Sequence, residues 1–132
     1  MGMIHAALFR RRILVVEDSF FLASYAADIL EEAGAQVVGP VPSIGQALEL
    51  AASMPLDAAV YNCFLRSIRA DRLAETLDRH GVPSVVLSLI GKDNSDPLLR
   101  DHDVIQWPFN PQHLLETLSA AIVRHRQTSS TH

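Results

Sequence analysis

Polar and aromatic side chains follow four of the apolar runs in this sequence, and their types are ones that can do chemistry. Glu17 and Asp18 follow the first run, Asn62 the third and Ser88 the fourth, and Trp107-Pro108-Phe109 closes the fifth. Two neighbouring carboxylates can bind Mg²⁺ or act as acid and base, and a serine hydroxyl can hydrogen-bond an anion. These residues form the candidate functional site.

The segments that must position these residues alternate in type. Five short apolar segments have the composition of buried strands: 13–16, 36–41, 57–61, 85–87 and 104–107. Apolar residues recur at helical spacing in four further stretches: 22–33, 44–51, 73–77 and 114–122. A short fourth helix is predicted at Asp96-Pro97 and a loop at 63–67, and Ser43 and Asn110 are predicted N-caps.

This alternation predicts the fold. Strand–helix–strand units form right-handed crossovers, which give a parallel sheet with helices on both faces. Five such units fit a doubly wound, five-stranded α/β fold of flavodoxin-like (βα)5 type with strand order 2-1-3-4-5. In such sheets function gathers at the carboxyl ends of the strands, so the candidate residues should lie together. The expected boundaries are a solvated N-terminal arm at 1–11, a domain at 12–124 and a frayed tail at 125–132.

Four segments carry a resemblance to a known family. ILVVEDS, DAAVYN, PSVVLS and the Pro-Phe pair after the fifth strand resemble the signature regions of response-regulator receiver domains of bacterial two-component signalling, over about residues 12–124. In that family an acidic pair helps to bind Mg²⁺ and an aspartate after the third strand accepts the phosphoryl group. A serine or threonine senses that group, and a lysine before proline pairs with it. The resemblance implies that Glu17 and Asp18 are the acidic pair, Ser88 is the hydroxyl residue, and the Trp107–Pro108 bond is cis.

Two positions depart from the receiver pattern. Asn62 stands in place of the phosphate-accepting aspartate, and Trp107 stands in place of the lysine. A neutral amide lacks the charge and the available lone pairs of the carboxylate nucleophile. We therefore predict a degenerate receiver, or pseudo-receiver, that is not phosphorylated at Asn62. With one carboxylate fewer, Mg²⁺ binding at Glu17 and Asp18 should be weak or absent, and no other cofactor is implied.

The two replacements fit together electrostatically. A lysine left without its phosphate partner would be a desolvated, unpaired cation. We expect the Asn62 amide to donate a hydrogen bond to one of the two acids, and the Trp107 ring to fill part of the phosphate and metal pocket. Purely structural roles stay open for three residues: Asp18 suits a helix N-cap, Ser88 a local backbone hydrogen bond, and Trp107 core packing.

The resemblance predicts a stand-alone, non-enzymatic signalling module of a two-component or phosphorelay system that acts through protein–protein interaction. Its expected partner is a signalling protein, either a histidine kinase or a downstream regulator. A homodimer is expected through the fourth helix, the fifth strand and the fifth helix, around Leu98, Leu99 and Val104.

Two other functions compete with this one. The first is a small flavodoxin-like enzyme or ligand-binding domain that uses Glu17 and Asp18 as acid and base. The segment EDSFF lacks the Gly- or Ser-rich loop that a phosphate-bearing cofactor needs. The second is a regulator phosphorylated on another side chain, such as Ser19 or Ser88.

Composition and charge limit the partners and the location that we expect for this protein. The 132 residues carry a net charge of −4 with a pI near 5.8, so we expect no nucleic-acid partner. No apolar run approaches the roughly 20 residues that span a bilayer, so no membrane partner is expected. The arginines at 10–12 follow the apolar start instead of preceding it, unlike a secretory signal. One cysteine, Cys63, cannot form an internal disulfide, and we expect a cytoplasmic protein.

Overall fold

The computed structural model describes residues 5–90 and 92–130, with side chains described as far as residue 127. The elements in chain order are β1 (Arg12–Val16), α1 (Phe20–Glu32), β2 (Gln36–Val41), α2 (Ile44–Ser53), β3 (Ala58–Asn62), β4 (Phe64–Leu65), β5 (Ile68–Arg69), α3 (Asp71–Arg79), β6 (Ser84–Ser88), α4 (Pro97–Arg100), β7 (Asp103–Gln106) and α5 (Pro111–Ser130). No helix within the described ranges is long and apolar enough to cross a membrane.

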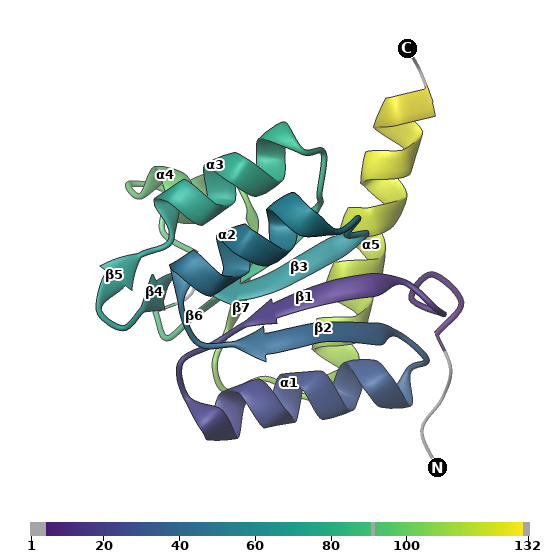
Figure 1. The fold of residues 1–132 in the computed structure, drawn as a ribbon, viewed down its shortest axis with the longest axis horizontal. Helices are drawn as coiled ribbons and strands as arrows, with labels where there is room; N and C mark the ends of the chain where they lie inside the picture. Colours follow the sequence, from purple (N-terminus) through teal and green to yellow (C-terminus); the bar gives the residue numbers. More distant parts are fainter. Residues whose placement is uncertain (1–4, 91, 131–132) are drawn as a thin grey trace.

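The main sheet has five parallel strands in the order β2-β1-β3-β6-β7 (Figure 1), which confirms the predicted order. Successive residues of β1 point to opposite faces, and both faces are buried. Ile13 and Val15 pack with α1 and α5, whereas Leu14 and Val16 pack with α2, α3 and α4. The apolar strands are therefore covered by helices on both sides, as parallel sheets require.

Short polar side chains begin most of the helices. Ser43 accepts a hydrogen bond from the N–H of Gln46 at 3.3 Å, and Asn110 accepts one from His113 at 2.9 Å, which confirms both predicted caps. The cap of α1 is Ser19, whose Oγ accepts from the N–H of Leu22 at 3.4 Å. The N-cap role considered for Asp18 is therefore wrong, and the Asp18 carboxylate is available for contacts at the carboxyl edge of the sheet.

The described parts of the predicted arm and tail have more contacts and more helix than predicted. The arm is not solvated throughout: Leu8 is fully buried, and the N–H of Arg10 donates to Gly34 O at 2.8 Å, so the arm packs at the end of α1. The predicted frayed tail is wrong as far as residue 130, because α5 continues to Ser130 (Figure 1). No glycine or proline interrupts the helix there, and propagation needs no apolar stripe. Residues 1–4 and 131–132 of the predicted arm and tail lie outside the described ranges.

A small antiparallel hairpin at 64–69 forms where a loop at 63–67 was predicted. Phe64 pairs with Arg69 and Leu65 with Ile68. The two turn residues, Arg66 and Ser67, have φ of 53° and 65°, the left-handed conformation that tight hairpin turns demand. That conformation favours Asn-Gly, so Arg-Ser gave no sequence signal for a turn.

Candidate functional site

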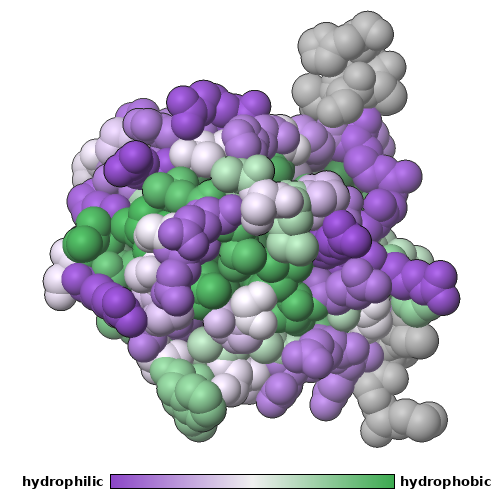
Figure 2. Space-filling view, in the orientation of Figure 1, coloured by the Kyte–Doolittle hydropathy of each residue, from purple (hydrophilic) through white to green (hydrophobic). Residues whose placement is uncertain are grey.

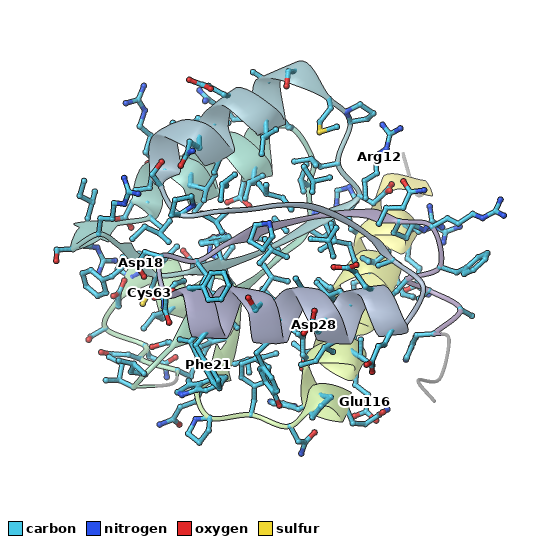
Figure 3. All side chains as sticks on the ribbon, turned by 60° about the horizontal axis from the view of Figure 1, so that its bottom comes forward. Arg12, Asp18, Phe21, Asp28, Cys63 and Glu116 are labelled. Atoms are coloured by element: carbon cyan, nitrogen blue, oxygen red, sulfur yellow. The ribbon has the colours of Figure 1, made fainter. Side chains whose placement is uncertain are left out.

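Strand register brings the candidate residues to one edge of the sheet. Val16 of β1 lies beside Tyr61 of β3, Asn62 beside Leu87, and Ser88 beside Gln106. Glu17 and Asp18 follow β1 directly, so they lie next to Asn62. Figure 3 shows Asp18 close to Cys63 at the start of α1. The carboxyl edge therefore collects the predicted site.

Glu17 is the buried member of the acidic pair, with 3% of its surface exposed. Its Oε1 accepts a hydrogen bond from Asn62 Nδ2 at 2.8 Å, and its Oε2 accepts one from the N–H of Ser19 at 3.0 Å. Burial disfavours the charged form and raises the pKa of Glu17, against the two hydrogen bonds, which lower it. The predicted bond from the Asn62 amide to an acid is confirmed.

The Asn62 side chain is committed at both ends. While its Nδ2 donates to Glu17, its Oδ1 accepts from the N–H of Phe64 at 3.0 Å. These two contacts fix the amide orientation, because exchanging O and N would place a donor against a donor and an acceptor against a carboxylate. Asn62 therefore ties the end of β1 to the hairpin.

Asp18 lies in a different environment from its neighbour. Its side chain is exposed, and its Oδ2 accepts from the N–H of Arg66 at 2.7 Å. That hydrogen bond lowers the pKa of Asp18, with a smaller contribution from the charge of Arg66. Two adjacent carboxyls thus have pKa values that move in opposite directions: Glu17 upward because it is buried, Asp18 downward because a backbone N–H faces it.

The residues at this edge do not fit a resident Mg²⁺ ion. Both Glu17 oxygens already accept hydrogen bonds from Asn62 and Ser19, and one Asp18 oxygen accepts from Arg66. The amide oxygen of Asn62 accepts a hydrogen bond from the N–H of Phe64. Across the described ranges, no three His, Cys, Asp or Glu side chains group to hold a metal ion. Mg²⁺ prefers near-octahedral oxygen ligands, and this arrangement offers too few.

Ser88 and Trp107 lie at the other half of the edge. Ser88 is 1% exposed, and its Oγ accepts from the N–H of Ile90 at 3.2 Å. The Trp107 ring packs edge-on against Tyr25 and Phe109, with ring centroids 5.5 and 5.2 Å apart. The Trp107–Pro108 peptide bond is cis, in agreement with the expectation.

Trp107 does not fill the pocket beside Asn62, so that part of the hypothesis is wrong. The cavity there has a volume of about 690 Å³ and is lined by Asp18, Asn62, Cys63, Phe64, Ser67, Arg69, Ser88, Leu89, Ile90, Asp96 and Leu99. An indole gains more by stacking edge-to-face with two other aromatic rings than by facing buried carboxyl and amide groups. Packing is thus the role that the structure gives Trp107.

The comparisons identify the family. No protein-family model matches the sequence, and no curated protein matches it by sequence. Among solved structures, SdrG from Sphingomonas melonis Fr1 is 30% identical, with a TM-score of 0.74, and the match covers 90% of this chain and 99% of SdrG. The chain belongs to the response-regulator receiver domains.

Two more distant receivers share the fold. The receiver domain of the sensor histidine kinase PA1611 from Pseudomonas aeruginosa PAO1, solved with magnesium in its active-site cleft, is 22% identical with a TM-score of 0.75, and the match covers 86% of this chain and 98% of that one. The anti-anti-sigma factor PhyR from Bartonella quintana is 17% identical with a TM-score of 0.78 over 96% of this chain and 53% of PhyR.

This receiver also has a salt-bridge cluster that the sequence did not reveal. The guanidinium of Arg69, on the hairpin, bonds Asp71 at 2.8 and 3.2 Å and Asp96 at 2.7 and 2.9 Å. These contacts raise the pKa of Arg69 and lower that of Asp96, whose carboxylate also caps α4. Asp96 lies 27 residues from Arg69, so no local sequence pattern predicts this pair. The cluster joins the hairpin to α3 and α4 around the cavity.

Proposed function

We propose that this receiver regulates a partner protein by direct contact and does not accept a phosphoryl group at position 62. The observation that supports this most is the double commitment of the Asn62 amide, to Glu17 through Nδ2 and to Phe64 through Oδ1. Phosphoryl transfer to a receiver needs a carboxylate oxygen with a free lone pair and a negative charge. The amide has no such charge, and its only oxygen is already an acceptor.

The surrounding groups support the same proposal. The metal ion that neutralises charge during phosphoryl transfer finds too few free oxygens here. The Ser88 hydroxyl, which would sense a phosphoryl group, accepts a hydrogen bond from its own loop at Ile90. The lysine position holds Trp107, which packs with Tyr25 and Phe109. Each part of the phosphorylation site is thus either replaced or used for structure.

We propose a signalling protein as the partner, either a histidine kinase or a downstream regulator, and a cytoplasmic location. PhyR, about half of which matches this fold, is an anti-anti-sigma factor. The net charge of −4 disfavours nucleic acid. In this proposal the domain is a signalling module and not an enzyme.

The residues expected at a homodimer interface need correction. Leu98 and Leu99 are 4% and 1% exposed and pack in the core of their own chain, so they are not available to a second copy. The short helix α4 turns its two leucines inward against the sheet. A homodimer through α4, β7 and α5 remains part of the proposal, with the half-buried Val104 at its margin. Molar mass in solution by light scattering tests it.

Acid–base catalysis by Glu17 and Asp18 gains no support from the geometry. Both oxygens of Glu17 accept hydrogen bonds from the chain itself, and the side chain is buried. A catalytic acid or base needs a substrate proton within hydrogen-bond reach. Flavin or nucleotide retained on purification would favour this alternative instead.

The test is incubation of the whole chain with acetyl phosphate and Mg²⁺, read by intact mass. We expect no phosphoryl adduct. A stoichiometric adduct would overturn the proposal, and the variants Ser19→Ala and Ser88→Ala would then locate it. Loss of the adduct in either variant would establish the regulator phosphorylated on a different side chain.

A further inference from the structure

Large apolar side chains gather at the carboxyl edge instead of spreading over the surface. Eight are clearly exposed among the described residues, and six of them belong to this edge. We call these six the apolar rim: Phe20 and Phe21 at the start of α1, Phe64 and Ile68 on the hairpin, and Leu89 and Ile90 after β6. Their exposed fractions run from 48% to 88%. Single exposed apolar residues are ordinary, but a cluster of this kind marks an interaction site.

Half of the apolar rim lines the cavity beside Asn62. Phe64, Leu89 and Ile90 line that cavity, and the buried Cys63 and Leu99 line it as well. Its volume of about 690 Å³ lies in the range of pockets that take up ligands or a partner's side chains. The cavity therefore has apolar walls that are exposed to solvent and available to a partner.

Asp18 connects the two parts of the rim. It lines the large cavity and also a second one of about 280 Å³ that Phe20 and Pro40 line. In Figure 3, Asp18 lies beside Cys63, and Phe21 projects from the first turn of α1. In Figure 2, hydrophobic surface reaches the side of the molecule where Figure 1 places β4 and β5, and again near the start of α1.

The charges at the mouth of the cavity favour the binding of a positively charged group. Arg69 is neutralised by Asp71 and Asp96, which hold it with four hydrogen bonds, so it offers little to an anion. Asp18 is exposed; its carboxylate accepts the backbone N–H of Arg66, shares a hydrogen bond with Glu17 and is only weakly affected by the charge of Arg66. The lining thus carries two carboxylates and one guanidinium that is already paired. Its net negative charge repels a phosphate group or an anionic lipid surface.

We propose that this cavity receives an apolar side chain from a protein partner whose contact surface is basic. The apolar side chain would enter between Phe64, Leu89 and Ile90, while a neighbouring lysine or arginine would approach Asp18. Apolar anchors in pockets with a polar rim carry most of the affinity in such interfaces. The inference rests on the proposed function, since it names the class of partner, and it gives the space beside Asn62 a binding role.

The probe is a synthetic helical peptide of leucine and lysine, titrated into the ¹⁵N-labelled full chain. The matched control peptide replaces every lysine with glutamate. We expect the basic peptide to bind and to shift the amide signals of Cys63 and Leu99, with the acidic peptide at least about tenfold weaker. Vesicles of anionic lipid, added without peptide, are expected not to shift these signals.

Variants separate this site from non-specific attraction. Leu89→Ser/Ile90→Ser should weaken peptide binding at least about tenfold, because it removes two cavity walls without disturbing buried core. Val123→Ser, at an exposed apolar position on α5, is the matched control and should leave affinity unchanged. Asp18→Asn should weaken binding by about threefold, the size expected of an exposed charge. Circular dichroism checks that each variant is folded.

Several results would overturn the proposal. One is binding that maps to another face or survives Leu89→Ser/Ile90→Ser, and another is equal affinity for both peptides. A third is self-association of the free chain that Leu89→Ser/Ile90→Ser abolishes, since the occupant would then be a second copy. None of these depends on phosphorylation. An adduct with acetyl phosphate would refute the proposed function separately, whatever the peptides do.

Discussion

Under the proposed function, the two halves of the carboxyl edge differ from receiver chemistry in different ways. At the ends of β1 and β3, Asn62 makes polar contacts with Glu17 and the hairpin. At the ends of β6 and β7, Trp107 packs against Tyr25 and Phe109. In that proposal an amide stands where a receiver has a carboxylate and keeps nearly its shape, whereas an indole stands where a receiver has a lysine and joins an aromatic cluster.

This difference separates two kinds of contribution to the stability of the fold. The β1–β3 half is a polar network in which charge and hydrogen bonding set the energies, and the β6–β7 half is a packing cluster in which buried area does. Substitutions in the first half should therefore respond to pH and Mg²⁺. Substitutions in the second half should not.

The largest effect is expected from Trp107→Ala. Removal of the half-buried indole opens a gap between Tyr25 and Phe109, which should lower the free energy of unfolding by about 3 kcal/mol. Urea denaturation followed by circular dichroism measures it. Phe9→Ala, at a 45% exposed ring, is the control and should change little. A Trp107→Ala loss that depends on pH or Mg²⁺ would break the distinction between the halves.

The next effect is expected from Asn62→Asp. A carboxylate at this position would face Glu17 across 2.8 Å and would meet like charge without a donor. Unfolding free energy at neutral pH should fall by about 2 kcal/mol, and Mg²⁺ should restore part of it because three carboxylates then share the site. Thermal melts in EDTA and in Mg²⁺ measure this. Stability that is unchanged in EDTA would contradict the role given to the amide.

The acidic pair gives a smaller effect with opposite signs at its two residues. Because the pKa of Glu17 is raised above its ordinary 4.5, its contribution to stability is present at lower pH and is lost as pH rises through the raised value. The pKa of Asp18 is lowered below 3.8, so its contribution is present above about pH 3.8 and is lost as pH falls. Glu17→Gln should remove the first dependence, and Asp18→Asn the second.

Urea midpoints between acid and neutral pH measure these two dependences. The exposed Asp18 should contribute under about 1 kcal/mol. If both variants changed the profile in the same direction, the contrast between the buried and the exposed carboxyl would be wrong.

The smallest effect is expected at the hairpin turn. Arg66 has a φ of 53°, which a glycine adopts without strain, so Arg66→Gly should stabilise the fold by about 0.5 kcal/mol. The N–H that donates to Asp18 is a backbone group and stays in place. Differential scanning calorimetry detects a change of this size, and a clear loss of stability would show that the Arg66 side chain matters more than its backbone.

Much of the fold could be predicted because it depends on local patterns. The apolar runs at 13–16 and 85–87 are buried on both faces, and their alternation with helical stretches leaves few topologies. The contact of Asn62 with Glu17 followed as well, since parallel strands place their carboxyl ends together. In these cases spacing along the chain determines neighbourhood in space.

The missed features depend on contacts between distant segments. The salt bridge from Arg69 to Asp96 and the burial of Leu8 arise only when separate elements meet. Trp107 was misplaced because it matches the receiver lysine position and was therefore expected to fill the pocket, whereas its aromatic neighbours offered better packing. Leu98 and Leu99 were assigned to an interface because receivers pair through the face that contains this helix, but in this chain both leucines are buried in the core.

The central claim is that the amide at position 62 is what prevents phosphorylation of this receiver. The most direct test treats the wild-type chain, Asn62→Asp and Asn62→Asp/Trp107→Lys alike with acetyl phosphate and Mg²⁺, and compares their intact masses. The account predicts no adduct on the wild-type chain, and an adduct on the variants that regain the carboxylate nucleophile. A wild-type chain that takes up a phosphoryl group as fully as Asn62→Asp would contradict it.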